Sequence, residues 1–216
     1  MRHPLITIDG PSASGKSSVS RLLAQKVGCP WVSTGAFYRG LALAAIEEKV
    51  DAKDEESLTK LVLSPIWEVK MTPQETHVFY QGKDVTERIT GEDIGSTASR
   101  ISQIPKVREA LLQRQRDCFD PEKGLIAEGR DCGTVVFPQA QLKIYLTAGA
   151  AQRAQRRSDE QSADLEKTLE MQQKRDLRDT QRKQAPLKMA EGAVEIDSSF
   201  LSLEEVVDKI FNLIKP

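Results

Sequence analysis

The fold is decided near the start of the chain, where residues 5–17 read LITIDGPSASGKS. The apolar run Leu5–Ile8 predicts a buried strand, and the pattern Gly-x4-Gly-Lys-Ser follows it from Gly10 to Ser17. Apolar residues then recur at helical spacing until Gly28, a typical helix stop. A strand, a glycine-rich loop and a helix in this order are typical of a loop that binds phosphate groups through its backbone N–H groups.

Each fixed position of this loop has a physical reason. A glycine at positions 10 and 15 lets the backbone approach an anion more closely than a Cβ would permit. Lys16 can reach the terminal phosphates of a nucleotide, and the Ser17 hydroxyl is a candidate ligand for Mg²⁺. We expect a nucleoside triphosphate with Mg²⁺ to bind to Gly10, Pro11, Ser12, Ala13, Ser14, Gly15, Lys16, Ser17 and Ser18.

Composition restricts the class of protein. The chain has 216 residues and carries 31 Lys and Arg against 32 Asp and Glu, a formal net charge of −1. A protein that coats nucleic acid or a membrane needs a basic excess, so any anion site here must be local. The three cysteines show no CxxC spacing, and no apolar run approaches the length of a membrane span. We expect a single cytoplasmic domain over residues 1–216, monomeric and without nucleic-acid or membrane partners.

Four further β-rich runs alternate with helical patterns along the chain. These runs are Trp31–Val32, Leu125–Ala127, Leu142–Leu146 and Val194–Ile196. Together with the first strand they predict an α/β P-loop fold of three layers, with a five-stranded parallel sheet between helices. An alternating pattern between Trp67 and Tyr80 interrupts this order and predicts a small antiparallel β insert, which we assign to about residues 61–92.

Several basic residues stand where a ligand site is expected. Arg39 follows the second predicted strand, and Arg130 and Asp131 follow the third. Open parallel sheets bind ligands at the carboxyl ends of their strands, so these residues and the glycine-rich loop should meet in one crevice. Arg108 lies in the helical segment Glu92–Asp117.

The predicted helical stretch Ala148–Arg182 is dense in charge. Arg175, Arg178, Asp179 and Arg182 recur at the spacing of one helix face. A solvent-exposed face of weak ion pairs would give the same pattern. However, arginine is used far more than lysine at these positions, and a planar guanidinium suits bidentate binding of phosphate.

These motifs together resemble those of the bacterial cytidylate kinase family of nucleoside monophosphate kinases. The resemblance rests on TIDGPSASGKSS, STGAFYR, PKVREALLQRQR, GRDCGTVVF and KRDLRDTQRKQAPL, which follow one another over nearly the whole chain. It implies a parallel-sheet core, a monophosphate-binding insert and a mobile helical lid, placed here at about residues 153–166. It also implies transfer of the γ-phosphoryl group of ATP to CMP or dCMP, giving ADP and CDP or dCDP, in pyrimidine nucleotide metabolism.

The resemblance assigns roles on the ATP side and in catalysis. It implies that Lys16, Arg130 and Arg182 are catalytic. The lid would begin with Arg153, Arg156 and Arg157, which would help to hold the ATP phosphates. Glu128 stands where relatives can carry Asp, so its contribution to the metal or water shell is left open.

The resemblance also implies an acceptor site. Its residues would be Thr34, Arg39, Ser99, Arg108, Arg130, Asp131, Arg175, Asp179 and Arg182. Within this set, the monophosphate would be bound by Arg39, Arg130 and Arg182. Cytosine would be read by Ser99, Arg108 and Asp131, and the ribose and phosphates would lie near Arg175 and Asp179.

Other proteins with this loop are alternatives. A GTPase would need an Asn-Lys-x-Asp motif, and the single asparagine, Asn212, does not form one. A kinase of another monophosphate or of shikimate, or a regulatory module that binds a nucleotide without transferring phosphate, would keep the same loop. The basic segment Arg100–Arg116 could contact RNA, although aromatic residues are scarce there and the overall charge is near zero.

Overall fold

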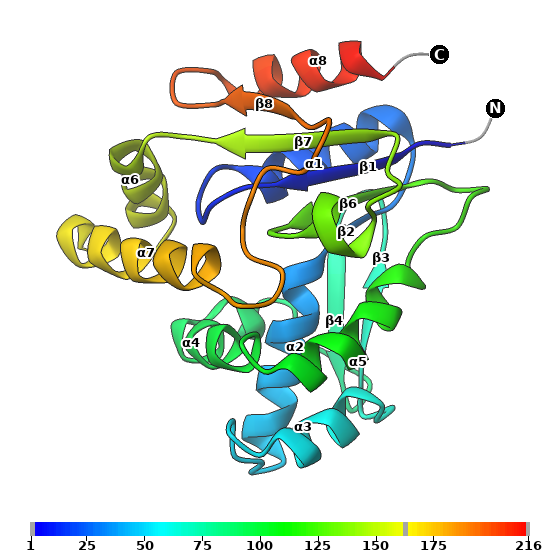
Figure 1. The fold of residues 1–216 in the computed structure, drawn as a ribbon, viewed down its shortest axis with the longest axis vertical. Coiled ribbons are helices and arrows are strands. Elements are labelled where there is room, and N and C mark those ends of the chain that lie inside the picture. Colours follow the sequence, from blue (N-terminus) through cyan, green and yellow to red (C-terminus); the bar gives the residue numbers. More distant parts are fainter. Residues whose placement is uncertain (1–2, 162–163, 215–216) are drawn as a thin grey trace.

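A central parallel sheet organises the molecule (Figure 1). The computed structural model describes residues 3–161 and 164–214. Five strands lie in the order β2-β6-β1-β7-β8 and comprise β1 (Leu5–Asp9), β2 (Trp31–Ser33), β6 (Leu125–Gly129), β7 (Leu142–Thr147) and β8 (Val194–Asp197). Each of the five predicted runs forms one of these strands, so the predicted parallel sheet is confirmed.

Strand β1 lies in the middle of the sheet, between β6 and β7, and all five of its residues are buried. It pairs with β6 from Leu5 opposite Leu125 to Asp9 opposite Gly129, and with β7 on its other side. Its carboxyl end, where the glycine-rich loop begins, therefore lies directly beside the carboxyl end of β6. This register brings a loop early in the sequence next to Arg130.

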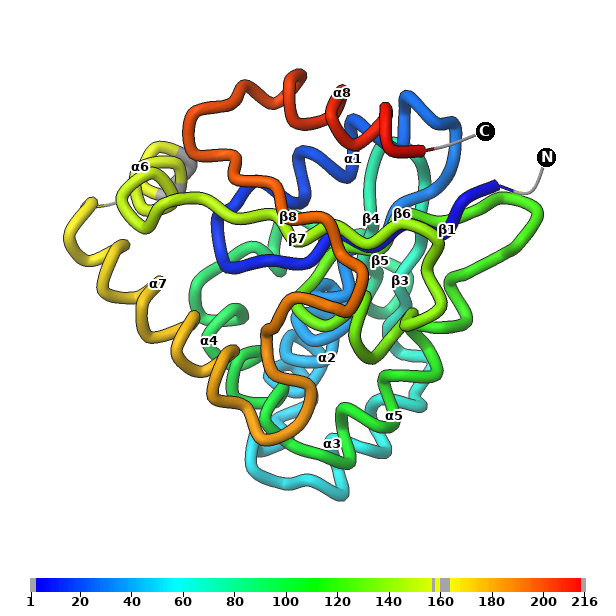
Figure 2. Tube along the Cα trace, turned by 45° about the horizontal axis from the view of Figure 1, so that its top comes forward, coloured from blue at the N-terminus to red at the C-terminus, as the bar shows by residue number. Residues whose placement is uncertain are grey.

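Helices cover both faces of the sheet (Figures 1 and 2). One face carries α1 (Lys16–Val27) and α8 (Leu203–Leu213), which pack with the β1 residues Ile6 and Ile8 in one apolar cluster. The other face carries α2 (Thr34–Glu47) and α5 (Pro105–Arg116), whose cluster includes Leu5. The alternation of side chains along a strand thus supplies the two apolar surfaces that the three-layer fold needs.

Between α2 and α5 the chain forms α3 (Glu55–Val62), β3 (Trp67–Met71), β4 (Thr76–Tyr80), β5 (Lys83–Asp84), a 3-10 turn (Arg88–Thr90) and α4 (Glu92–Ile101). The insert expected at about residues 61–92 falls within this stretch. The antiparallel β3–β4 pair was predicted, but α3 and β5 were not. Helix α3 is short, and the signal that marks it is the Asp54 carboxylate, which caps the helix by accepting the Ser57 N–H at 3.0 Å.

Two helices lie beyond the carboxyl ends of β7 and β1, where the lid is expected (Figure 1). They are α6 (Ala150–Gln161) and α7 (Leu165–Thr180), which pack against each other. Residues 162 and 163, within the expected lid of 153–166, lie outside the described residues. The prediction of a helical face that runs to Arg182 was wrong, because α7 ends at Thr180 and Gln181 closes it by donating its N–H to the Leu177 carbonyl.

None of the helices in residues 3–161 and 164–214 is both long and apolar enough to cross a lipid bilayer.

Candidate active site

A cavity of about 340 Å³ opens at the carboxyl ends of β1, β2 and β6, beside the start of α1. Segments far apart in the sequence supply its wall. The lining residues are Ser12, Ala13, Gly15, Lys16, Ser17, Ser18, Ser33, Thr34, Gly35, Tyr38, Arg39, Gly95, Ala98, Ser99, Ser102, Glu128, Gly129, Arg130, Asp131, Arg175, Asp179 and Arg182. Most of the predicted site residues thus meet in one crevice.

The glycine-rich loop has the backbone that its sequence predicts. Gly10 has φ +156°, and a Cβ there would lie 2.0 Å from the Leu146 carbonyl oxygen, so no side chain fits. Gly15 has φ +88°, in the left-handed region, and precedes the first turn of α1. Gly10, Pro11 and Ser14 shape the loop but do not line the cavity.

Lys16 is buried at the base of the cavity. Its ammonium group donates to the Pro11 carbonyl at 2.6 Å, and the residue is 5% exposed. Burial, with a smaller contribution from the nearby positive charge of Arg130, lowers the pKa of Lys16 to about 7. A phosphate anion in the cavity would favour the charged form of this side chain and raise the pKa again.

Ser17 and Glu128 place two oxygen groups side by side at the start of α1. The Ser17 hydroxyl donates to Glu128 Oε1 at 3.1 Å, and Glu128 is buried. Over the described residues, no cluster of three or more His, Cys, Asp or Glu side chains could hold a metal ion alone. The pair fits Mg²⁺, which prefers oxygen ligands and commonly takes one or two from the protein and others from phosphate and water.

Asp9, which the sequence analysis did not single out, ties two parts of the site together. Its carboxylate accepts the N–H groups of Cys132 and Gly133 at 2.8 and 2.7 Å. Burial raises the pKa of Asp9 to about 6, although these two hydrogen bonds act in the opposite direction. The residue fixes the π-helical turn Cys132–Val136 that follows Arg130 and Asp131. In the sequence, the signal that could have found Asp9 was a charged residue at the end of a predicted buried strand.

The cavity has a local excess of positive charge. Five cationic side chains line it against three carboxylates, although the whole chain has a formal charge of −1. Arg182 is buried, and its Nε has no hydrogen-bond partner among the described residues. Burial, followed by repulsion from Arg108, lowers the pKa of Arg182. A buried guanidinium with an unsatisfied donor at a cavity wall is suited to bind an anion.

Several of these arginines are held by groups from other elements. Arg130 Nε donates to Asp179 Oδ2 at 2.7 Å, and Arg175 pairs with Glu92. Arg39 donates to the Ile89 carbonyl at 2.5 Å. The interactions of Arg130 and Arg175 join α7 to the end of β6 and to the start of α4. Arg178, on the same helix, does not line the cavity.

The predicted cytosine-reading residues lie together, but not all of them reach the cavity. Asp131 and Ser99 line it, whereas Arg108 is buried and forms an ion pair with Asp131 without lining the cavity. The Arg108 guanidinium also lies 5.6 Å from the centre of the Tyr38 ring. The Thr34 hydroxyl, which was predicted to touch the acceptor, donates to the Glu128 carbonyl at 2.9 Å.

Of the arginines expected at the start of the lid, Arg153 contacts the glycine-rich loop, although it does not line the cavity. Arg153 donates to the Ser12 carbonyl at 3.0 Å and to Asp176 Oδ2 at 2.5 Å. Arg156 donates to the Ser198 carbonyl at 2.6 Å. The Arg157 side chain lies outside the described part of the structure.

Some lining residues were not predicted as site residues. They are Ser33, Gly35, Tyr38, Gly95, Ala98, Ser102 and Gly129, besides Glu128, whose role was left open. Tyr38 precedes Arg39 in the sequence, and Ser102 lies one helical turn beyond Ser99, so both could have been found by proximity to predicted residues. The small residues carry no such chemical signal.

Comparisons with known proteins identify the family of this chain. Residues 6–216 match the family model described as cytidylate kinase. A cytidylate kinase of Bdellovibrio bacteriovorus is 52% identical to this chain, with 98% of this chain and 97% of the relative covered. A cytidylate kinase of Pseudomonas syringae is 47% identical, with 98% and 95% covered. The chain belongs to the cytidylate kinase family, whose members are nucleoside monophosphate kinases.

Proposed function

We propose that this enzyme transfers the γ-phosphoryl group of ATP to CMP or dCMP and releases ADP and CDP or dCDP. The observation that carries the proposal is the cavity beside Lys16, where five cationic side chains face three carboxylates. Two polyanionic nucleotides repel each other, and a local positive excess offsets that repulsion. The cytidylate kinase names of the relatives agree with this acceptor.

The residue types fit a phosphate acceptor. Phosphoryl transfer passes through a loose transition state, so positioning and electrostatic stabilisation supply most of the catalysis. The second pKa of a phosphate monoester is about 6, so its oxygen is already ionised at neutral pH and needs no general base. We assign the monophosphate to Arg39, Arg130 and Arg182, and the ATP phosphates to the glycine-rich loop with Lys16.

Mg²⁺ would be held by Ser17, either directly or through water, with Glu128 beside it. When bound, Mg²⁺ neutralises charge on the ATP phosphates. Glu128 accepts a hydrogen bond from the Ser17 hydroxyl and so orients the serine oxygen. Because Glu128 is buried, it can keep this orientation before any nucleotide arrives.

The base preference follows from hydrogen-bond polarity. The N4 amino group of cytosine is a donor, and the Asp131 carboxylate and the Ser99 hydroxyl can accept from it. Uracil would present a carbonyl oxygen to Asp131, at a cost of about 1–3 kcal/mol for mispaired buried groups. Arg108 acts from behind Asp131, as its counter-ion, and fixes the position of the carboxylate.

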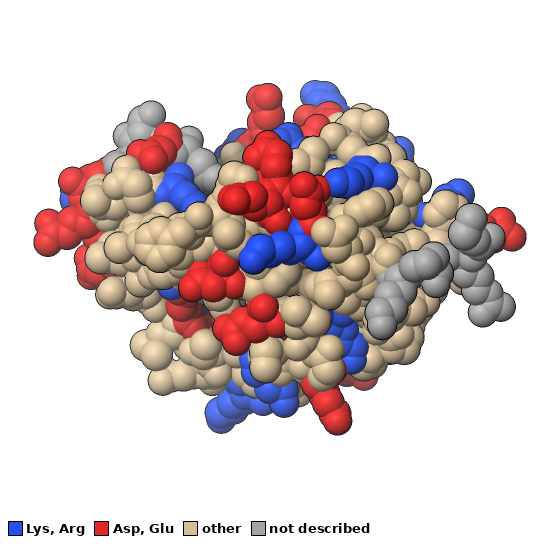
Figure 3. Space-filling view, turned by 90° about the horizontal axis from the view of Figure 1, so that it is seen from above, with Lys and Arg blue, Asp and Glu red and all other residues tan. Residues whose placement is uncertain are grey.

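We also propose that the enzyme works in the cytoplasm and that it does not bind RNA. Cys29, Cys118 and Cys132 are free thiols, as is common in a reducing cytoplasm. In the basic segment, Arg114 and Arg116 donate to the Val62 and Val136 carbonyls, so their guanidinium groups are already engaged in the fold and are poorly placed for RNA. The face seen in Figure 3 mixes acidic and basic side chains, with acidic ones gathered near its middle.

The test is ADP release from ATP and Mg²⁺ in the presence of CMP, dCMP, UMP, AMP, GMP or shikimate. We expect CMP and dCMP to give the highest kcat/KM, with UMP about tenfold or more below them. Comparable kcat/KM for UMP would contradict the assigned base selection. Turnover of shikimate or AMP alone, or nucleotide binding without turnover of any acceptor, would replace the proposal by one of the alternatives.

A further inference from the structure

The residue Asp176, on α7, touches the glycine-rich loop and was not among the predicted site residues. Its Oδ1 atom accepts the Ser12 N–H at 3.2 Å, and Ser12 lines the cavity. Loops of this kind bind phosphate groups through their backbone N–H groups. A carboxylate oxygen of the protein therefore already takes one of the N–H groups that the loop could offer to a phosphate.

Arg153, on α6, completes a closed set of contacts around Ser12. Its Nη1 atom donates to Asp176 Oδ2 at 2.5 Å and to the Ser12 carbonyl at 3.0 Å. Its Nε atom donates to the Ala148 carbonyl at 3.0 Å. The side chains of Arg153 and Asp176 are 11% and 20% exposed, so water screens this ion pair only weakly. One ion pair, with a member from each of the expected lid helices, thus engages both main-chain polar groups of Ser12.

A phosphate group would compete directly with the Asp176 carboxylate. Both are anions, and both accept from the same kinds of donor, a backbone N–H and a guanidinium. Phosphates bound in the loop beside Ser12 would repel Asp176 and attract Arg153. The arginine would therefore keep an anionic partner when the carboxylate leaves, whereas the carboxylate would gain access to water.

We propose that the Asp176 carboxylate holds, in the free enzyme, a hydrogen-bond position that a phosphate of the donor takes when it binds. Binding displaces Asp176 from Ser12 and releases Arg153 to pair with the phosphates. Asp176 is thus a positioning residue, which acts on the donor through Ser12 and Arg153 and lowers the affinity of the loop for anions. This inference rests on the proposed function only in that the phosphates of a nucleoside triphosphate bind to the glycine-rich loop.

The affinity for a triphosphate without a nucleoside tests this competition. Calorimetry would measure the Kd of inorganic tripolyphosphate with Mg²⁺ for wild type, Asp176→Ala and Asp176→Asn. We expect Asp176→Ala to bind tripolyphosphate about fivefold or more tightly, because it has no carboxylate to displace. Asp176→Asn keeps a neutral acceptor for the Ser12 N–H and should tighten binding by less. It also carries the test, with the same sign, should Asp176→Ala fail to fold.

The sign of the change separates this role from a merely structural one. Loss of a residue that only stabilised the lid would loosen Arg153 and weaken the binding of tripolyphosphate. Unchanged or weaker binding by both Asp176 variants would therefore overturn the proposal.

Glu170→Gln is the matched control, because it removes one negative charge from the same helix. Glu170 is 63% exposed and pairs with Lys174 on the surface. We expect this variant to bind tripolyphosphate within about twofold of wild type, since exposed ion pairs contribute little. Tightening equal to that of Asp176→Ala would indicate a general effect of charge and would contradict displacement at Ser12.

Hydrogen exchange in α6 gives a second readout of the same contact. In the free Asp176→Ala protein the amides of α6 should exchange faster than in wild type, because Arg153 has lost its partner on α7. With tripolyphosphate and Mg²⁺ bound, the two proteins should exchange at the same rate. Faster exchange of the variant in the bound state as well would show that Asp176 still holds Arg153 there, which contradicts displacement.

The two proposals fail separately. If none of the acceptors is phosphorylated but Asp176→Ala still binds tripolyphosphate more tightly than wild type, the proposed function is wrong and this inference stands. If CMP is phosphorylated and the Asp176 variants do not bind tripolyphosphate more tightly, the proposed function stands and this inference is wrong.

Discussion

At the residue scale, the site depends on charged side chains that are buried before any ligand is present. Lys16, Arg182 and the Arg108–Asp131 pair are all nine-tenths buried or more. A buried charge without a partner is costly, so each of these groups either has a counter-ion or gains one when a nucleotide binds. Two predictions follow from this cost.

The first prediction concerns Lys16. Because its pKa is lowered to about 7 in the free enzyme, most of this side chain is neutral at about pH 8. Phosphate favours the charged form, so ATP binding at that pH should take up close to one proton. Calorimetry of MgATP in buffers with different ionisation enthalpies measures this uptake. Lys16→Arg, which stays charged, should show none, and zero uptake by wild type would contradict the expectation.

The second prediction concerns Asp131. Asp131→Ala leaves the Arg108 guanidinium buried without its counter-ion, so the free energy of unfolding should fall by about 3–5 kcal/mol. Asp131→Asn preserves the shape of the side chain and should lower the preference of kcat/KM for CMP over UMP about tenfold. The KM for ATP should stay close to that of wild type.

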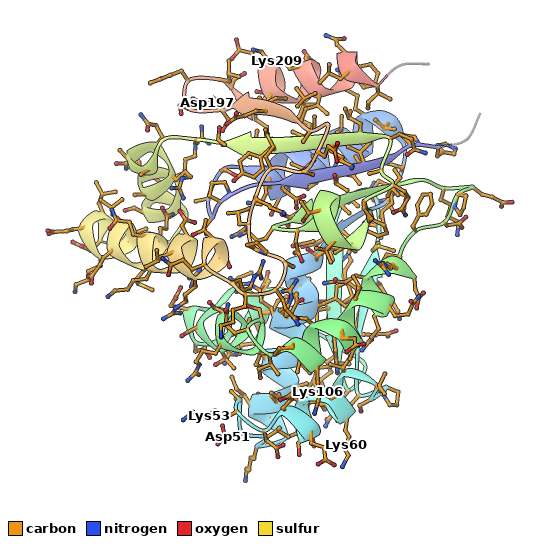
Figure 4. All side chains as sticks on the ribbon, viewed as in Figure 1. Asp51, Lys53, Lys60, Lys106, Asp197 and Lys209 are labelled. Atoms are coloured by element: carbon orange, nitrogen blue, oxygen red, sulfur yellow. The ribbon has the colours of Figure 1, made fainter. Side chains whose placement is uncertain are left out.

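Asp51→Ala is the control for both Asp131 variants. Asp51 lies at the lower end of the molecule in Figure 4, near Lys53 and away from the lid helices α6 and α7. It should change neither base preference nor KM. Equal loss of CMP preference and ATP affinity in Asp131→Asn would show that Asp131 does not act on the base.

At the scale of elements, the expected lid helices α6 and α7 are held mainly by polar contacts rather than by an apolar core. Thr168 and Gln172 are the buried residues of α7, and Ala154 is the buried apolar residue of α6 among those that the structure describes. The pairs that join these helices to the rest of the fold include Arg153–Asp176 and Arg130–Asp179. Elements with few buried apolar contacts open locally at low free energy.

We therefore expect the amides of α6 to exchange at least about tenfold faster than those of β1 in the free enzyme. Addition of a non-hydrolysable ATP analogue and CMP should slow the exchange in α6, because the ligands bring negative charge to the lid arginines. Hydrogen exchange with mass spectrometry measures both rates. Full protection of α6 in the free enzyme would contradict this expectation.

At the scale of the whole molecule, the insert and the central sheet share one apolar core. Trp67 on β3 is 1% exposed and lies edge-on to Phe37 of α2, with ring centroids 6.4 Å apart. Its indole N–H donates to the Leu61 carbonyl at 2.9 Å. A Cβ on Gly40 would lie 2.9 Å from the indole ring, so α2 approaches β3 closely. The insert is consequently packed on α2, the helix that follows β2.

This shared core predicts cooperative unfolding. Trp67→Ala should lower the free energy of unfolding by about 3–5 kcal/mol and keep a single transition in urea. Leu63→Ala is the control, because Leu63 is 74% exposed and should change stability by less than about 0.5 kcal/mol. Two separate transitions in the Trp67→Ala variant, detected by circular dichroism, would show that the insert unfolds independently.

The amino-acid sequence by itself determined the strand–loop–helix unit of residues 5–17, the five parallel strands and most of the lining of the cavity. These features follow from local periodicity and from the position of residues at strand ends, both of which are visible in a linear chain. Only the tertiary structure decided that Asp9 anchors Cys132 and Gly133 and that Arg108 lies behind Asp131. Those contacts join residues 123, 124 and 23 positions apart in the sequence. Helical and strand spacing carry no information over such separations. The partner of each charged group is set by which polar groups are buried beside it in the folded chain.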